Sequence, residues 1–133
     1  MELKGTKTEK NLMEALGVEG IVTPGRQIGQ TLGFPTANIP IREGVCERGV
    51  YRTQVKIEGI DEVFDAMSNV GYNPSVGGSE LRLESHLFGF EGDLYGRRIW
   101  VHLTEKIRDE IRFGSVEELR AQLEKDKEII LNR

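Results

Sequence analysis

The strongest constraint on the fold is a period-two alternation of apolar and polar residues through the middle of the chain. It runs over residues 50–57, 81–88 and 98–103, and it is the pattern of strands with one face in the core. Residues 17–23 and 62–70 predict further strands. Glycines interrupt these runs, as turns and bulges require. No helical pattern separates the strands, so we expect about six antiparallel strands instead of parallel crossovers.

One helix is predicted after the strands. Ser115 and Glu118 have the spacing of a capping box, which marks a helix N-terminus. We expect the inner face of this helix to carry four apolar residues, Val116, Leu119, Leu123 and Ile130. A mainly β fold therefore follows, with strands in a closed or nearly closed barrel, which leaves few exposed edges, and a C-terminal helix.

Length and charge limit the function classes. The chain has 133 residues, net charge −4 and one cysteine, Cys46, which we take as an incidental thiol of a reducing, cytoplasmic protein. No run is apolar enough to span a membrane, and Cys46, His86 and His102 cannot form a structural zinc site. A clustered basic surface for nucleic acid is not expected. We divide the chain into an extension, residues 1–16, with a short helix pattern over 8–16, and a barrel domain, residues 17–133.

A glycine-rich segment is the first candidate for chemistry. Residues 20–41 contain no acid and one base, Arg26, and Gly25, Gly29 and Gly33 are spaced by four. Backbone N–H groups in such a segment can approach a phosphate closely. The spacing is neither the dinucleotide fingerprint nor a P-loop, so a plain surface loop stays open as the alternative.

The next residues, Pro35 to Asn38, allow two interpretations. In an extended segment, Thr36 and Asn38 point to one side and offer two neutral oxygens, which could complete a Mg²⁺ site together with phosphate and water. The residues alone favour the other interpretation, a turn, because proline presets φ and asparagine tolerates the left-handed region.

Six motifs in order resemble riboflavin kinase (flavokinase), over roughly residues 17–130. They are Leu32-Gly-Phe-Pro-Thr-Ala-Asn38; Gly49-Val-Tyr51; a loop, Asn69-Val-Gly-Tyr-Asn-Pro74; Leu83-Glu-Ser-His86; a tight turn, Asp93-Leu-Tyr-Gly96; and Ile107-Arg-Asp-Glu110 with Phe113 and the helix that follows.

The resemblance implies a six-stranded antiparallel Greek-key barrel that transfers the γ-phosphate of ATP to the ribityl 5′-hydroxyl of riboflavin, making FMN. It implies Glu84 as general base and Thr36 and Asn38 as Mg²⁺ ligands. The implied nucleotide-binding residues are Gly25, Arg26, Gly29, Gly33, Pro35, Thr36 and Asn38, and the implied flavin-binding residues are Asn69, Arg108, Glu110 and Phe113.

Structural interpretations without a catalytic role remain open for three residues. Glu84 could lie on a solvated strand face, Asn69 could cap a turn, and His86 could be a surface or supporting histidine. Tyr95 is expected to pack, and no role is assigned to His102. No His-x-Gly-His motif of the FAD-forming adenylyltransferase occurs in the sequence, so we expect FMN as the final product.

Two other function classes remain. The first is a flavin-binding carrier or sensor without catalysis, which would need neither Glu84 nor the Thr36–Asn38 pair. The second is a barrel that binds single-stranded nucleic acid, which the low aromatic content and negative charge disfavour. Riboflavin and ATP are the expected partners, with no nucleic acid and no membrane, and the chain is expected to be a monomer.

Overall fold

The structure of the chain is a computed structural model that describes residues 17–23, 36–75 and 78–132. The short helix predicted over 8–16 lies outside these residues. So do Gly25, Arg26, Gly29, Gly33 and Pro35, which the sequence predicts as nucleotide-binding.

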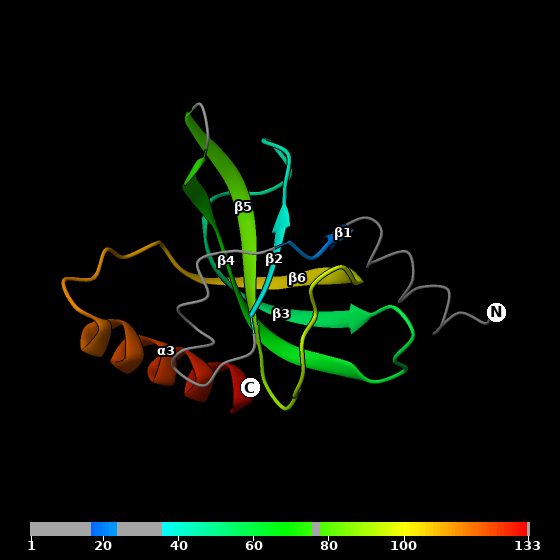
Figure 1. The fold of residues 1–133 in the computed structure, drawn as a ribbon. Coiled ribbons are helices and arrows are strands. Elements are labelled where there is room, and N and C mark those ends of the chain that lie inside the picture. Colours follow the sequence, from blue (N-terminus) through cyan, green and yellow to red (C-terminus); the bar gives the residue numbers. More distant parts are fainter. Residues whose placement is uncertain (1–16, 24–35, 76–77, 133) are drawn as a thin grey trace.

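Six strands and one helix follow each other along the chain (Figure 1). The strands are β1 (Gly17–Ile21), β2 (Thr36–Pro40), β3 (Gly49–Ile57), β4 (Val63–Ser75), β5 (Gly78–Leu87) and β6 (Arg98–Arg108), and the helix is α3 (Val116–Leu131).

The strands form one antiparallel sheet in the order β1-β6-β3-β4-β5-β2. β3, β4 and β5 are successive neighbours, and β6 returns to lie beside β3, which is the Greek-key arrangement. A bridge between Thr23 and Asn38 joins the two edges of the sheet. Gly20 permits this approach, since a Cβ there would come within 3.2 Å of the Ile39 side chain. The predicted fold, a nearly closed Greek-key barrel with a C-terminal helix, is confirmed.

The barrel interior holds the main core. The inward residues of the predicted alternation are buried, among them Val55, Leu83 and Val101, each with no exposed surface, except Leu103, which is partly buried against the core. Burial of apolar side chains contributes roughly 25 cal/mol per Å² removed from water, so this phase of the alternation decides which face of each strand turns inward.

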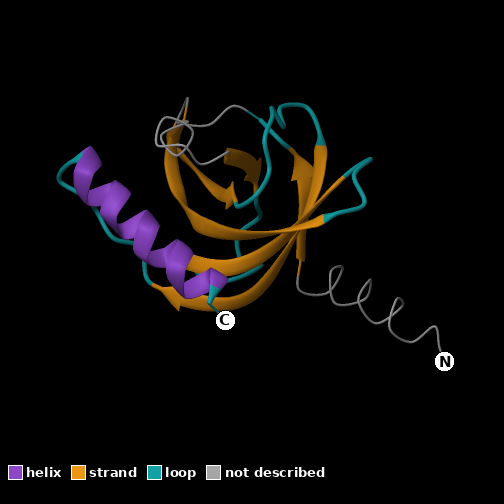
Figure 2. Cartoon of the chain, turned by 90° about the horizontal axis from the view of Figure 1, so that it is seen from below, coloured by secondary structure: helices purple, strands orange, loops and turns teal. Residues whose placement is uncertain are grey.

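A second, smaller core lies between the outside of the barrel and α3, which runs along the barrel wall (Figure 2). Leu123 and Ile130 of the helix pack against Val50 and Met67. The predicted N-cap is confirmed: Ser115 accepts a hydrogen bond from the Glu118 N–H at 3.2 Å. The prediction for Val116 is wrong, because this residue, in the first turn of the helix, is 54% exposed.

Three local predictions are corrected. Residues 36–40 form β2, so the turn that the residues alone favoured is wrong; pairing with β5 supplies the backbone hydrogen bonds that an extended segment needs. The loop predicted at 69–74 lies within β4. The tight turn at 93–96 is present, but Leu94 is its buried residue, whereas Tyr95 is exposed.

Gly49, at the start of β3, shows why its motif requires glycine. Its φ of +147° is one that side chains rarely adopt, and a Cβ would meet the Arg108 carbonyl oxygen at 3.0 Å. The close approach brings the beginning of β3 against the end of β6.

Candidate active site

A row of three polar side chains crosses the outer face of the barrel. Strand pairing places Asn38 of β2 opposite Glu84 of β5, and Glu84 opposite Asn69 of β4. Their neighbours Leu83 and Ser85 point into the barrel and are buried, so the three polar side chains share the outer face. Directly opposed residues have Cβ atoms about 4.5–5.5 Å apart, so the pairing brings one carboxylate between two carboxamides.

The solvated-face interpretation of Glu84 is wrong. Its side chain is only 20% exposed, and that of Arg82, two residues earlier, is 14% exposed. A carboxylate that is mostly buried but still partly exposed stays open to a ligand on one side, which suits a group that must accept a proton.

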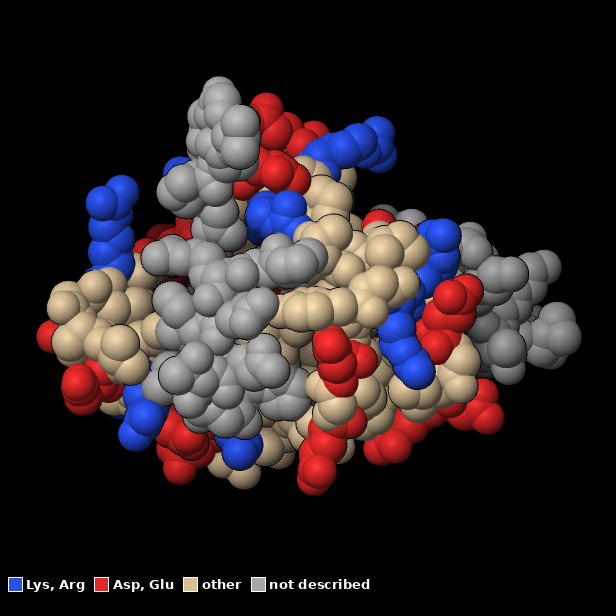
Figure 3. All heavy atoms as spheres, in the orientation of Figure 1, with Lys and Arg blue, Asp and Glu red and all other residues tan. Residues whose placement is uncertain are grey.

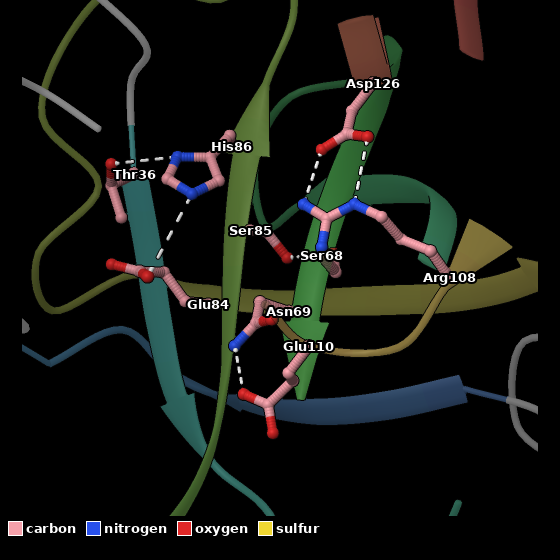
Figure 4. Close-up of polar contacts among 9 residues, drawn as sticks. All are labelled: Thr36, Ser68, Asn69, Glu84, Ser85, His86, Arg108, Glu110 and Asp126. Carbon is pink, nitrogen blue, oxygen red and sulfur yellow. Dashed lines mark hydrogen bonds and ion pairs between the residues drawn. The ribbon is translucent and has the colours of Figure 1, made fainter. Parts of the chain in front are cut away.

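His86 forms a second row with Thr36, next to the first (Figure 4). Its Nδ1 lies 3.5 Å from the Thr36 hydroxyl, and its Nε2 lies 4.0 Å from a Glu84 carboxylate oxygen. Burial lowers the pKa of His86, and the nearby carboxylates of Glu84 and Asp126 only partly oppose this. His86 is buried, so its placement at the surface is wrong, while a supporting role beside Thr36 and Glu84 fits the geometry.

Asn38 is held by Arg82. The Arg82 guanidinium donates to the Asn38 side-chain oxygen, to the Thr23 hydroxyl and, at 2.8 Å, to Glu80. Asn38 is 2% exposed, and its side-chain nitrogen has no partner among the described residues. The carboxamide is therefore fixed on one side and unsatisfied on the other.

These residues fit a cation that a ligand completes. No group of three or more His, Cys, Asp or Glu side chains among the described residues could hold a metal alone. Thr36 and Asn38 lie two residues apart on one face and offer a hydroxyl and a carboxamide oxygen, with the Glu84 carboxylate adjacent. The unpartnered Asn38 amide nitrogen is a hydrogen-bond donor, so it suits a phosphate oxygen beside the cation. Mg²⁺ commonly binds through few protein oxygens together with substrate phosphates and water, which this donor set allows.

The structure brings together two of the predicted flavin-binding residues. Asn69 donates to the Glu110 carboxylate at 3.2 Å. Glu110 also lies over Gly71, where any Cβ would meet its carboxylate. The missing side chain at position 71 gives Glu110 its place beside the polar row. Phe113 is half-buried in the segment that links β6 to α3.

Arg108, a third predicted flavin-binding residue, is paired with the helix. Its Nη2 and Nε donate to the two carboxylate oxygens of Asp126 at 2.7 and 3.1 Å. Sequence reasoning missed Asp126. The available signal was its spacing, three residues after Leu123 and four before Ile130, which places an acid on the apolar face of the helix.

A chain of hydroxyl groups lies behind the site, inside the barrel. Ser68 Oγ is 2.8 Å from Thr53 Oγ1 and 2.6 Å from Ser85 Oγ, and all three residues have no exposed surface. Ser68 precedes Asn69 and Ser85 follows Glu84, so the chain ties together the two strands that carry these side chains. Their polar type at inward positions was the available sequence signal.

The surface around these elements carries both signs of charge. On the face shown in Figure 3, basic and acidic side chains of the described residues are interspersed, with no continuous patch of either sign. Among the described helices, none is long and apolar enough to cross a membrane.

Fold and site together define a class: a small Greek-key barrel with a carboxylate, two carboxamides and an arginine gathered on its outer face. The family model described as "Flavokinase: Riboflavin kinase" matches residues 12–132. The chain therefore belongs to the riboflavin kinase family.

Individual relatives agree with this assignment. The bifunctional riboflavin kinase/FMN adenylyltransferase of Escherichia coli strain K12 is 42% identical over 120 residues, 90% of this chain and 38% of that protein. The RNA-binding riboflavin kinase RibR of Bacillus subtilis is 37% identical over 117 residues, 87% of this chain and 50% of that protein. The chain thus spans half or less of the length of these relatives.

Two solved structures share the fold. A Streptococcus pneumoniae protein described as a macrolide-efflux protein superposes with a TM-score of 0.75 at 30% identity, covering 93% of this chain and 46% of that one. Riboflavin kinase from Trypanosoma brucei superposes with a TM-score of 0.58 at 22% identity, covering 87% of this chain and 77% of that one.

Proposed function

We propose that the chain transfers the γ-phosphoryl group of ATP to the ribityl 5′-hydroxyl of riboflavin, producing FMN and ADP. The observation that carries the proposal is the row Asn38–Glu84–Asn69, together with membership of the riboflavin kinase family. The hydroxyl oxygen forms a bond to the γ-phosphorus, the bond from that phosphorus to the β-phosphate oxygen breaks, and ADP leaves.

Glu84 accepts the proton of the 5′-hydroxyl. Phosphoryl transfer depends mainly on alignment and charge stabilisation, and a positioned base contributes typically about 10²–10⁴ in rate. His86 borders both Glu84 and Thr36, and its lowered pKa favours the neutral imidazole, which adds no positive charge beside the base.

Mg²⁺ is the proposed metal, with Thr36 and Asn38 as its protein ligands. When bound with ATP, this ion neutralises phosphate charge. Arg82 holds the Asn38 carboxamide in place. The predicted role of the loop from Gly25 to Gly33 in covering the phosphates stays a prediction.

The flavin side of the site is assigned to Asn69, Glu110 and Phe113. Asn69 and Glu110 are hydrogen-bonded to each other next to Glu84, so a flavin placed here would have its ribityl chain within reach of the base. Whether Arg108 touches the flavin directly also stays a prediction, since its guanidinium is paired with Asp126.

The wider expectations belong to the same proposal: riboflavin and ATP as partners, FMN as the final product of this chain, a monomer, and a cytoplasmic location. Absence of a nucleic-acid partner is also a prediction, and a family relative named as RNA-binding makes it worth testing.

The test is a chromatographic assay for FMN with purified protein, riboflavin, ATP and Mg²⁺. We expect FMN from the wild type and at least about 100-fold slower turnover in Glu84→Gln, with flavin and nucleotide affinities retained. The matched control is Glu19→Gln, which removes an exposed strand carboxylate paired with Arg98 and leaves turnover unchanged. Near-normal turnover in Glu84→Gln refutes its role. Tight riboflavin binding that is indifferent to Mg²⁺ and ATP, without FMN, identifies a carrier.

A further inference from the structure

Asp126 is a fully buried carboxylate on the barrel-facing side of α3. It accepts from Arg108 Nε at 3.1 Å, from Arg108 Nη2 at 2.7 Å and from Gln122 Nε2 at 3.0 Å, and its exposed fraction is 0%. An isolated buried charge is costly, so this one depends on its bidentate partner. Figure 4 shows Asp126 above the Arg108 guanidinium, with the pair above and to the right of Glu84 and Asn69 in this view.

Arg108, the partner of Asp126, lies where β6 ends and the segment toward α3 begins. Arg108 is the last residue of β6, and its Nη1 also donates to the carbonyl oxygen of Asp109 at 3.0 Å. Two residues later, Glu110 accepts from Asn69. The guanidinium therefore contacts both the helix and the first residue of the segment 109–114, which leads from β6 to α3.

A contribution to stability does not by itself explain why this position carries an ion pair. The helix already has apolar contacts with the barrel, through Leu123 and Ile130 against Val50 and Met67. Apolar residues in place of a buried ion pair are often as stabilising or more so. A bidentate pair differs from apolar contacts in fixing direction, because two parallel hydrogen bonds allow a narrow range of orientations.

We propose that Asp126 is a positioning residue: through Arg108 it sets the course of segment 109–114 and so places Glu110 and Phe113 for the flavin. The inference rests on the proposed function in one respect, namely that this segment contacts riboflavin. Asp126 touches neither substrate. Its proposed contribution is to riboflavin affinity, and the KM for ATP reports whether its electrostatic effect on His86, next to Thr36, also reaches the nucleotide side.

Asp126→Asn tests the proposal, because it keeps the shape of the side chain and removes the charge. We expect the KM for riboflavin to rise about tenfold, as loss of a charge-assisted hydrogen bond predicts, with the KM for ATP within about twofold of wild type. Leu123→Ala is the matched control. It weakens the apolar contacts between α3 and the barrel, while the Arg108 and Asp126 side chains are both retained.

A purely structural role predicts that the two variants behave alike, in proportion to their loss of stability. Positioning predicts a selective riboflavin effect in Asp126→Asn alone. Equal effects of both variants on both KM values, or an unchanged riboflavin KM in Asp126→Asn, overturn the proposal. If Asp126→Asn does not fold, Asp126→Glu, which keeps the charge and displaces the carboxylate, takes its place with the same expected selectivity.

Hydrogen exchange provides a readout that needs no activity. Amides of residues 109–114 should exchange faster in Asp126→Asn than in wild type. In Leu123→Ala, their exchange should change only as much as the loss of global stability predicts. A wild type that makes no FMN refutes the proposed function, and the exchange comparison still decides whether Asp126 positions the segment. Unchanged exchange of 109–114 in Asp126→Asn overturns the positioning role.

Discussion

Replacing Ser68 with alanine removes the middle hydroxyl of the buried chain Thr53–Ser68–Ser85. Both hydrogen bonds of the chain, at 2.8 and 2.6 Å, are lost together, and the Thr53 and Ser85 hydroxyls each lose a partner in a site with no exposed surface. A typical hydrogen bond contributes about 1 kcal/mol net, and leaving a buried group unsatisfied costs about 1–3 kcal/mol. We therefore expect Ser68→Ala to lower the free energy of unfolding by about 2–4 kcal/mol.

Thr53→Val is the informative comparison. It removes one end of the chain with almost no change of shape and leaves the Ser68–Ser85 bond intact, so its expected loss is about 1 kcal/mol. With an unfolding entropy of about 2.1 cal/mol/K per residue over 133 residues, each kcal/mol corresponds to roughly 3–4 °C in Tm. The expected Tm decreases are about 7–14 °C for Ser68→Ala and about 3–4 °C for Thr53→Val.

Thermal and urea unfolding, followed by circular dichroism and by the fluorescence of the single tryptophan, Trp100, measure both values. The triple variant Thr53→Val, Ser68→Ala, Ser85→Ala should be less destabilised than the sum of the three single variants, because it leaves no unsatisfied hydroxyl. If Ser68→Ala loses no more stability than Thr53→Val, the hydroxyl chain does not act as a connected unit and the reasoning is wrong.

Three further outcomes are expected. Arg82→Gln should raise the Mg²⁺ concentration for half-maximal turnover by about 10–100-fold, because Arg82 orients Asn38, a proposed metal ligand. Arg82→Lys keeps the charge but loses the planar set of donors, so it separates orientation from charge. An unchanged Mg²⁺ dependence in Arg82→Gln contradicts the role of this contact. Gly49→Ala should lower the free energy of unfolding by about 1–3 kcal/mol, and with it Tm, because φ is +147° and the Cβ meets the Arg108 carbonyl. A melting curve like that of the wild type excludes this strain. Burial raises the pKa of the Cys46 thiol, so its alkylation by iodoacetamide at pH 7–8 should be slower than that of a cysteine peptide and should keep accelerating above pH 9; equal rates at pH 8 contradict the burial effect.

Much of the site could be anticipated from local pattern and motif. The alternation places Glu84 and His86 on one face of a strand and Leu83 and Ser85 on the other, and the structure confirms this division. How deeply that face is buried could not be anticipated. Exposure depends on what packs over a strand, and His86 is buried although the polar residues Arg82 and Glu84 share its strand face.

β2 was the element hardest to anticipate. The segment 36–40 is short and contains a proline, so local preference favours a turn. Its extended form is stabilised by hydrogen bonds to β5, whose paired residues lie more than forty positions away in the sequence. Only this pairing places Asn38 opposite Glu84. The partner of Asp126 was hidden for the same reason, since Arg108 approaches it through the folding of α3 onto the barrel.

By itself, the sequence determined the inward and outward faces of β3, β5 and β6, the N-terminus of α3 at its Ser115 cap, and the order of motifs that identifies the family. These features depend on residues close together in the chain, where period and capping act directly. The tertiary structure decided the register of β2 and β4 against β5, the closure of the barrel, and the pairing of Arg108 with Asp126. Such contacts join residues remote in sequence, and a shift of one residue in strand pairing would separate the same side chains, so local pattern carries no record of them.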